Sequence, residues 1–327
     1  MERERWAVAI GGHSLKKPED VQNIIKLLFE AADKRNAIIS LLGHGSGPQA
    51  GDGLDEFLKA PASGFNTDEF NKLVSTGNEA AICNLGGQIK EQITALHKSA
   101  RVIVTRCLVN PDTMQPAKPI GRGLNEEEAR KLSAILTVKK VDDNGSRVLV
   151  PSPLIKRIFQ KDLKDAAQST ISGETAIAGG AGGLPYVCEN HILKPVAAVI
   201  DKDWTLGELV KALSSVVHFD RSIILTRAPA LVRDFGVLQK AIEQNGSKAV
   251  HANWREEYAK AGLIQNISLA EAEQLYEQGV ATAGAGPKLG ASIMMVRSFV
   301  RQAVICAPEN LEASLDGTEE SGTVIHR

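Results

Sequence analysis

A lysine between two aspartates, Asp201-Lys202-Asp203, follows directly on the apolar run of residues 196–200. The run is typical of a buried strand, and charges so close to a core are costly unless they are paired or used. A lysine held there is suited to bind a phosphoryl group, and the aspartates are suited to fix that lysine or to hold a magnesium ion. A solvated edge between a strand and a loop would also suit these residues, so the triad alone leaves both interpretations open.

Three glycine-rich segments each follow an apolar, strand-like run. The first is Gly11-Gly12 after residues 6–10, and the others span residues 43–51 and 179–183. Glycine permits close approach of the backbone, and unpaired N–H groups at such bends suit an anion. The second segment is neither a Walker A loop nor a GxGxxG fingerprint in its usual setting. Because parallel strands end at one edge of a sheet, the three bends together predict a phosphate-binding site there.

The elements that must position these residues alternate between apolar strands and amphipathic helices. This alternation predicts an α/β layered domain with a mainly parallel sheet, and residues 323–325 are expected to form a last strand. A chain of 327 residues is long enough to bury a large core. Lysine and arginine (38) nearly balance aspartate and glutamate (39), so the composition predicts no nucleic-acid partner and no anionic membrane.

No apolar run approaches the length of a membrane span, and the first residues lack the apolar segment of a signal peptide. The cysteines are scattered and form no Cys-x-x-Cys pair. We therefore expect a cytoplasmic protein with reduced, buried thiols at Cys83, Cys107, Cys188 and Cys306.

Six segments, in this order, resemble motifs of the amino acid kinase family, and within it those of the carbamate kinases. They are AVAIGGHSL (7–15), LLGHGSGPQAGDGL (41–54), PAKPIGRGLNEEEA (116–129), VLVPSP (148–153), IAGGAGGLPYV (177–187) and AAVIDKDW (197–204). The resemblance implies a three-layer α/β/α fold with a mainly parallel central sheet and a small protruding lid subdomain. It implies that residues 1–109 form the N-terminal part of the kinase domain, with the site for the small acid. Residues 110–153 would form the lid, and residues 154–327 the C-terminal part of the kinase domain, with the nucleotide site. It also implies a homodimer.

Carbamate kinases pass the γ-phosphoryl group of ATP to carbamate, and in metabolism the reaction commonly runs in reverse to make ATP from ADP and carbamoyl phosphate. The resemblance implies that Lys202 contacts the transferring phosphoryl group and that Asp203 organises the lysines around it. Lys288 would reach the β- and γ-phosphates, and Lys118 would close over the small acid. For each lysine the alternative is a solvated surface charge. Mg²⁺ would come with the nucleotide, held more by phosphates and water than by a protein cage.

The resemblance also implies two groups of binding residues. Backbone donors and neighbours of the small acid would be Gly11, Gly12, His13, Gly45, Ser46 and Gly47. The nucleotide would lie against Gly180, Gly182, Asp201, Thr226, Arg227 and Pro287.

Several residues depart from the family pattern at these predicted contacts. His13 and Ser46 replace asparagines, and residues 75–81 match poorly a run that lies near the acid. Ala181 interrupts a glycine quartet and would place a methyl group where the backbone passes close to phosphate. His13 is either a new binding group or proton donor, or a steric substitute. Arg227 either pairs with a phosphate or acidic substrate, or forms a surface salt bridge.

Three functions remain open on the sequence. The first is a carbamate kinase-like phosphotransferase. The second is a kinase of the same fold that acts on a different small acid, which the altered positions 13, 46 and 75–81 favour. The third is a noncatalytic relative that binds a nucleotide or metabolite or scaffolds a partner; Ala181 favours it, whereas the retained Lys202, Asp203 and Lys288 argue against it.

Overall fold

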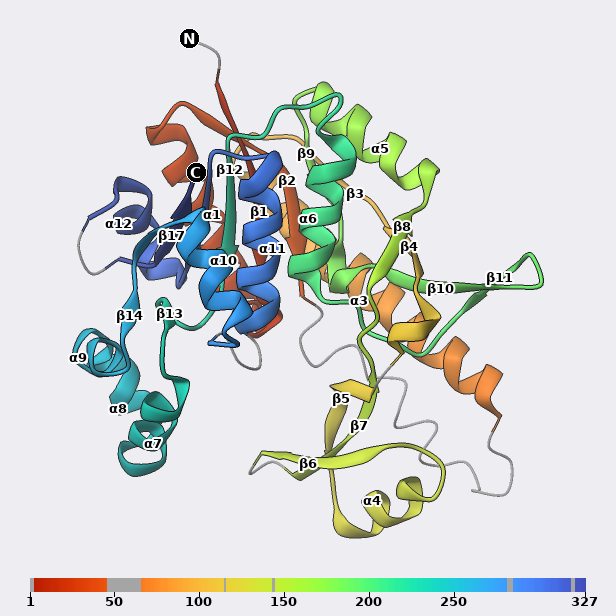
Figure 1. Ribbon diagram of the computed structural model, residues 1–327. Helices are drawn as coiled ribbons and strands as arrows, with labels where there is room; N and C mark the ends of the chain where they lie inside the picture. Colours follow the sequence, from red (N-terminus) through yellow and green to blue (C-terminus); the bar gives the residue numbers. More distant parts are fainter. Residues whose placement is uncertain (1–2, 46–65, 115, 143–144, 281–284, 319–320) are drawn as a thin grey trace.

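The centre of the molecule is an eight-stranded, mainly parallel sheet, as the sequence predicts (Figure 1). The computed structural model describes residues 3–45, 66–114, 116–142, 145–280, 285–318 and 321–327. Within the central sheet, the neighbouring strands that the structure describes run parallel, except that β16 and β17 are antiparallel. Across the sheet the order is β15 (Asn266–Ser268), β17 (Thr323–His326), β16 (Gln302–Cys306), β12 (Arg221–Leu225), β1 (Glu4–Ile10), β2 (Ala37–His44), β9 (Thr175–Ile177) and β3 (Ala100–Val102).

Strand β1 shows why the sheet is covered on both faces. Successive side chains of a strand point to opposite faces. Ala7 and Ala9 lie in one buried apolar cluster, whereas Trp6, Val8 and Ile10 lie in another. A strand buried on both faces must be apolar at nearly every position, and this explains the uninterrupted apolar run that the sequence shows at residues 6–10.

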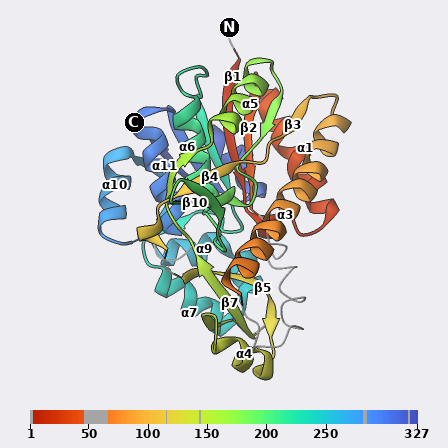
Figure 2. The same ribbon diagram turned by 90° about the vertical axis from the view of Figure 1, so that its right-hand side faces the viewer.

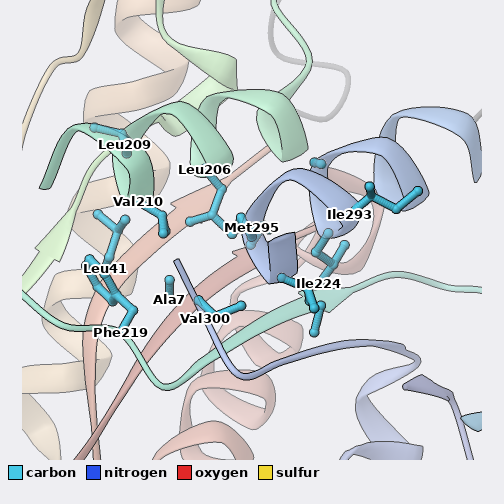
Figure 3. Packing of buried hydrophobic residues seen from close by; sticks show 14 of the residues in the cluster. Ala7, Leu41, Leu206, Leu209, Val210, Phe219, Ile224, Ile293, Met295 and Val300 are labelled. Atoms are coloured by element: carbon cyan, nitrogen blue, oxygen red, sulfur yellow. The ribbon is translucent and has the colours of Figure 1, made fainter. Parts of the chain in front are cut away.

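Two layers of helices cover these faces, one on each side of β1 and β2 (Figure 2). Apolar side chains of α6 and α11 converge on the sheet, where Leu206, Val210 and Met295 pack near Ala7 and Ile224 (Figure 3). The helical spacing of the apolar residues in 21–28 predicts a helix after the first glycine bend, and this helix is confirmed as part of α1. The Ala7 face carries α5 (Gln160–Ile171), α6 (Lys202–Leu213), α10 (Leu269–Glu277) and α11 (Ala285–Ser298), and the Trp6 face carries α1 (Pro18–Lys34), α3 (Thr67–Ala95) and α12 (Leu311–Asp316).

The three glycine-rich segments begin at the carboxyl edge of the sheet, after β1, β2 and β9, which run side by side. The ladder between β1 and β2 continues to its last residues, with Ile10 opposite His44. The N–H group of Gly45 then donates to the carbonyl of Ile10 at 2.9 Å, and that of Gly11 donates to the carbonyl of Leu225 at 2.9 Å. The predicted placement of the bends at one sheet edge is therefore confirmed.

The prediction of a strand at residues 196–200 is wrong, because this buried segment pairs with no strand. Its backbone groups bond instead to single carbonyls of β10 (Leu184–Glu189) and β7 (Gly145–Pro151), to one another, and to two side chains of α3. The Val199 N–H donates to the carbonyl of Pro151 at 2.9 Å, and the Ala197 N–H donates to Asn71 Oδ1 at 2.8 Å. The segment is apolar because it is buried, and periodicity cannot distinguish a buried connection from a short buried strand.

Three smaller units complete the described chain. Strands β11 (Ile192–Pro195), β10 (Leu184–Glu189), β4 (Arg106–Val109) and β8 (Ile155–Ile158) form a second sheet. A third sheet, of β5 (Pro116–Leu124), β7 (Gly145–Pro151) and β6 (Val138–Asp142), lies with α4 (Glu126–Ser133) at the bottom of Figure 1. The third unit holds β13 (Leu231–Val232), β14 (Leu263–Ile264), α7 (Phe235–Asn245), α8 (Ser247–Ala252) and α9 (Trp254–Lys260). The predicted domain boundaries at 109/110 and 153/154, and the role of the β5–β7–β6 unit as a lid, stay predictions.

The expectation of four buried thiols is wrong for two of them. Cys107 and Cys306 are buried, and burial raises the pKa of Cys306 to about 12. Cys83 and Cys188 are exposed. Cys83 faces solvent because α3 turns Ala81, Ile82 and Leu85 inward, so the residue between them lies on the outer side of the helix.

None of the helices in the described part of the chain is both long and apolar enough to cross a membrane.

Two glycines offer a matched test of how tightly the third bend packs. Gly182 has a φ of +79°, and a Cβ atom there would lie 2.0 Å from the carbonyl oxygen of Ile200. Gly173 has a φ of +83° and open space around it. Both alanine substitutions carry the cost of the left-handed backbone, about 1–2 kcal/mol. We expect Gly182→Ala to lower the free energy of unfolding by about 2 kcal/mol more than Gly173→Ala, because the Ile200 backbone must shift. Equal losses in urea unfolding would contradict this packing.

Candidate active site

The carboxylate of Asp203 joins two of the predicted lysines. Its Oδ1 accepts from Lys202 Nζ, and its Oδ2 lies 3.2 Å from Lys288 Nζ. Only 1% of the Asp203 side chain is exposed, and both lysine side chains are largely buried. Lys202 is the first residue of α6, and Lys288 lies in the first turn of α11, so two helix N-termini meet at this carboxylate.

Asp201 connects the start of α6 to the β5–β7–β6 unit. Its Oδ1 caps the helix by accepting from the Asp203 N–H at 3.0 Å. Its Oδ2 lies 2.7 Å from Nζ of Lys118, which belongs to β5. The structure therefore brings Lys118, Lys202 and Lys288 to one pair of aspartates.

Burial and neighbouring charges shift two pKa values in this cluster. Burial lowers the pKa of Lys202 below its usual 10.5; the adjacent Lys288 lowers it further, while Asp203 opposes the shift. Burial alone would raise the pKa of Asp201, but Lys118 and Lys202 outweigh it and hold this pKa below the usual 3.8. The Asp201 carboxylate is therefore ionised at neutral pH.

The aspartates serve the lysines and do not form a metal cage. Each of their four carboxylate oxygens already accepts from a lysine or a backbone N–H. Within the described residues no cluster of three or more histidine, cysteine, aspartate or glutamate side chains is arranged to hold a metal ion. Of the two roles that the sequence leaves open for the aspartates, the geometry favours fixing the lysine.

The first two glycine bends lie directly beside Lys202. A Cβ atom at Gly45 would lie 2.6 Å from the Gly12 nitrogen and 3.6 Å from Lys202 Cδ, so only glycine fits between them. The N–H groups of Gly11 and Gly45 extend the strand ladders, and their donation to a ligand stays a prediction. The N–H of Gly12 has no acceptor within the described residues. Of the glycines in the first two bends, we therefore expect Gly12 to donate its N–H to a ligand.

The third bend packs against the start of α6. The Thr205 hydroxyl donates to the carbonyl of Gly182 at 2.7 Å, which ties the bend to the helix that begins at Lys202. Ala181 has a left-handed φ of 52°, and its methyl group packs with Ile82 and Leu184. The expectation that this methyl lies in the path of a phosphate is therefore not met, because it points into an apolar cluster.

The other predicted residues are placed as follows. Thr226 follows β12, and its Cα lies 3.9 Å from the position of a Cβ on Gly11. Pro287 is in the first turn of α11, where proline is tolerated. Arg227 is exposed and forms no ion pair with the described residues, so the surface salt bridge is not found. The backbone of His13 is part of a short 3-10 helix (Gly12–Ser14) beside these bends.

Ser46 and Gly47 lie outside the described residues. The ligand-binding roles of Gly180, Gly182, Asp201, Thr226, Arg227, Pro287 and His13 stay predictions.

Sequence reasoning missed Asn71 and Asn78, which hold the segment that leads to Asp201. Asn78 is fully buried, and its Nδ2 donates to the carbonyl of Ala198 at 3.1 Å. Asn71 accepts from the Ala197 N–H. Their spacing of seven residues puts both on one face of α3, and this spacing is the signal that could have identified them. Asn78 also falls within residues 75–81, where the sequence departs from the family pattern.

His44 fills the space behind the second and third bends. Its Nδ1 lies 3.2 Å from the carbonyl oxygen of Gly45, and a Cβ at Gly180 would lie 2.6 Å from its Nε2. The Nε2 atom is buried without a hydrogen-bond partner among the described residues. Burial lowers the pKa of His44 to about 4, so the imidazole is neutral at pH 7 and holds the loop backbone.

The buried His44 should make the fold sensitive to acid. Its pKa is lowered from 6.5 to about 4 on folding, so the unfolded chain binds the extra proton and stability falls as the pH drops from 6.5 to 4. We expect wild-type protein to lose about 2 kcal/mol through this residue between pH 7 and pH 5. Urea unfolding of His44→Gln should show a smaller loss over the same interval. An identical pH dependence in both proteins would show that His44 is not the group responsible.

Comparison with known proteins gives relatives along nearly the whole chain, although no family model matches it. The carbamate kinase of Thermoplasma volcanium is 27% identical over 98% of this chain and 99% of the relative. Carbamate kinase 2 of Enterococcus faecalis is 30% identical over 97% of each chain. Among solved structures, carbamate kinase from Giardia lamblia bound to AMP-PNP covers 99% of this chain and 98% of its own, with a TM-score of 0.74 and 22% identity. The structural likeness shows a shared fold.

Proposed function

The chain belongs to the carbamate kinase family, and from this premise we propose that it transfers the γ-phosphoryl group of ATP to carbamate, giving ADP and carbamoyl phosphate. In the cell the reaction would run mainly toward ATP. Relatives named carbamate kinase, similar over nearly the full length, support the family assignment. The homodimer and the cytoplasmic location implied by the resemblance stay predictions.

The observation that carries this proposal is the binding of Lys202 and Lys288 to the single buried carboxylate of Asp203. Phosphoryl transfer needs in-line positioning and cations around a planar, negatively charged group. Lysine side chains are long and flexible, and an ion pair with a buried acceptor restricts where their ammonium groups lie. Asp203 thus acts as a positioning residue that presets two cations before a substrate arrives.

The same geometry suggests how the donor and acceptor are arranged. Lys202 lies beside Gly12 and Gly45, where it would contact the transferring phosphoryl group, with the Gly12 N–H as a second donor. Lys288, on the other helix, would bind the β- and γ-phosphates. Lys118 reaches the site from β5 and would close over the small acid. Mg²⁺ would arrive with the nucleotide and screen the charge of its phosphates.

A kinase of the same fold acting on another small acid is the second candidate. In the carbamate kinases that the sequence resembles, the run corresponding to residues 75–81 lies near the acid. Here these residues are part of α3, and Asn78 is engaged with Ala198. A change of one or two polar contacts is enough to alter the choice of small acid.

ATP formation from carbamoyl phosphate, ADP and Mg²⁺ tests the proposed reaction directly. We expect Lys202→Ala to lower the turnover number by about 10²-fold or more, because a cation is lost at the transferring group. Lys211→Ala is the matched control, since Lys211 is an exposed lysine in the last turn of the same helix. It should leave the rate and the unfolding midpoint unchanged. Lys202→Ala removes a partner of the buried Asp203 and should unfold at a lower denaturant concentration, but its circular dichroism spectrum should match that of the wild type in the absence of denaturant.

Each other result of this assay has a definite meaning. A Lys202→Ala rate equal to wild type would remove Lys202 from the chemistry. No ATP with retained nucleotide binding would favour a different small acid. Neither ATP nor nucleotide binding would favour a noncatalytic relative.

The lowered pKa of Lys202 predicts the alkaline limit of the reaction. In the free enzyme this lysine should lose its proton below the usual 10.5, so kcat/KM should fall at a pH lower than that of an ordinary lysine. Lys202→Arg keeps the positive charge at every accessible pH. We expect this variant to be slower but to show its alkaline decline at higher pH. If kcat/KM declined at the same alkaline pH in both proteins, the decline would be caused by a group other than Lys202.

A further inference from the structure

A cavity of about 510 Å³ opens at the amino edge of the central sheet, opposite the candidate active site. It is lined by Arg5 at the start of β1, by Arg301 just before β16, and by Val216 in the connection from α6 to β12. β1 spans about 20 Å between Arg5 and Gly11 at roughly 3.3 Å per residue. A volume of this size is typical of small-molecule pockets.

Arg5 lines this cavity, and one edge of its guanidinium makes no hydrogen bond with the described residues. Its Nη1 donates to the carbonyl of Thr170 at 3.0 Å and approaches Ser40 Oγ at 3.4 Å. No hydrogen bond of its Nε or Nη2 and no carboxylate within ion-pair distance is found among the described residues. The Nε–Nη2 edge of a guanidinium carries two parallel N–H groups that match a carboxylate or a phosphate.

The acidic residues in and around the cavity leave the guanidinium of one lining arginine, Arg5, without an ion pair among the described residues. Asp220 accepts from the Arg5 backbone N–H at 2.8 Å and pairs with Arg301. Glu4 accepts from the Trp6 indole N–H at 3.1 Å and pairs with Arg221 at 3.2 Å. Arg3, also in the lining, is half exposed and pairs with Asp33 at 3.7 Å. Of the three lining arginines, Arg3 and Arg301 have acidic partners, and the guanidinium of Arg5 has no ion pair with the described residues.

Apolar side chains border the charged part of the cavity. Ile171 and Val216 line it and are 61% and 55% exposed, and Val217 is buried beneath them. Apolar surface next to a free guanidinium edge suits a ligand with an anionic head and an apolar substituent.

We propose that this cavity binds a small organic anion, a carboxylate or a phosphate ester, with its charged head on the Nε–Nη2 edge of Arg5. The apolar part of the ligand covers Ile171 and Val216. This site is separate from the phosphoryl-transfer site, since the length of the sheet lies between them.

Calorimetric titration with n-butyl phosphate and with hexanoate tests the proposal and distinguishes the two head groups. All proteins carry Lys202→Ala, so that phosphate binding at the candidate active site is weakened. Butyl phosphate, hexanoate or both should bind this background protein with a dissociation constant below about 10 mM. Arg5→Gln should weaken that binding at least about tenfold. Arg157→Gln, at an exposed arginine of β8, is the matched control and should not change it.

Arg5→Gln also removes the hydrogen bonds of Arg5 to Thr170 and Ser40, so a second pair of variants tests the cavity without changing Arg5. Val216→Glu adds a negative charge at an exposed cavity position, and Val237→Glu adds one at an exposed position of α7 outside the cavity. Only Val216→Glu should weaken binding, by about tenfold. Absence of binding by both probes, or equal binding by the two glutamate variants, would overturn the proposal.

Discussion

The buried carboxylate of Asp203 imposes the main constraint on the candidate active site. An ionised carboxylate with so little solvent contact costs several kcal/mol unless opposite charges and hydrogen bonds surround it. Lys202 and Asp203 both lie at the start of α6, but Lys288 belongs to α11 and follows Asp203 by 85 residues in the chain. The packing of α6 beside α11 on the sheet is therefore tied to this one carboxylate. If either helix moved, a buried charge would lose its partner.

The glycine bends allow the lysines to lie close to the sheet edge. Where β1 and β2 end, the Gly11 and Gly45 N–H groups continue the ladders, which keeps the bends rigid. The absent side chain of Gly45 leaves room for the Lys202 stem against the Gly12 backbone. Asn71 and Asn78 of α3 bind the backbone of residues 197 and 198, in the segment that leads to Asp201. The charged cluster is thus supported by backbone geometry more than by further charges.

The two edges of the central sheet differ in how their positive charge is used. At the carboxyl edge, three lysines share two aspartates that are bonded at every oxygen. At the amino edge, Arg5 keeps one side of its guanidinium without a partner among the described residues. β1, α6 and α11 each run from one of these edges of the central sheet to the other. Both sites therefore rest on the same rigid core, which Figure 3 shows between α6, α11 and the sheet.

Much of this arrangement was determined by the sequence itself. Apolar runs and glycines are local signals, so they predicted β1, β2, the helix after the first bend and the meeting of three bends at one edge. The motif resemblance identified Lys118, Asp201, Lys202, Asp203 and Lys288, which the structure brings together. Only the tertiary structure decided that residues 196–200 form no strand, that Asn78 supports them, that the Ala181 methyl lies in an apolar cluster, and that Arg5 faces a cavity. Each of these depends on which distant segment supplies a partner, and composition and periodicity carry no information about contacts between segments far apart in the chain.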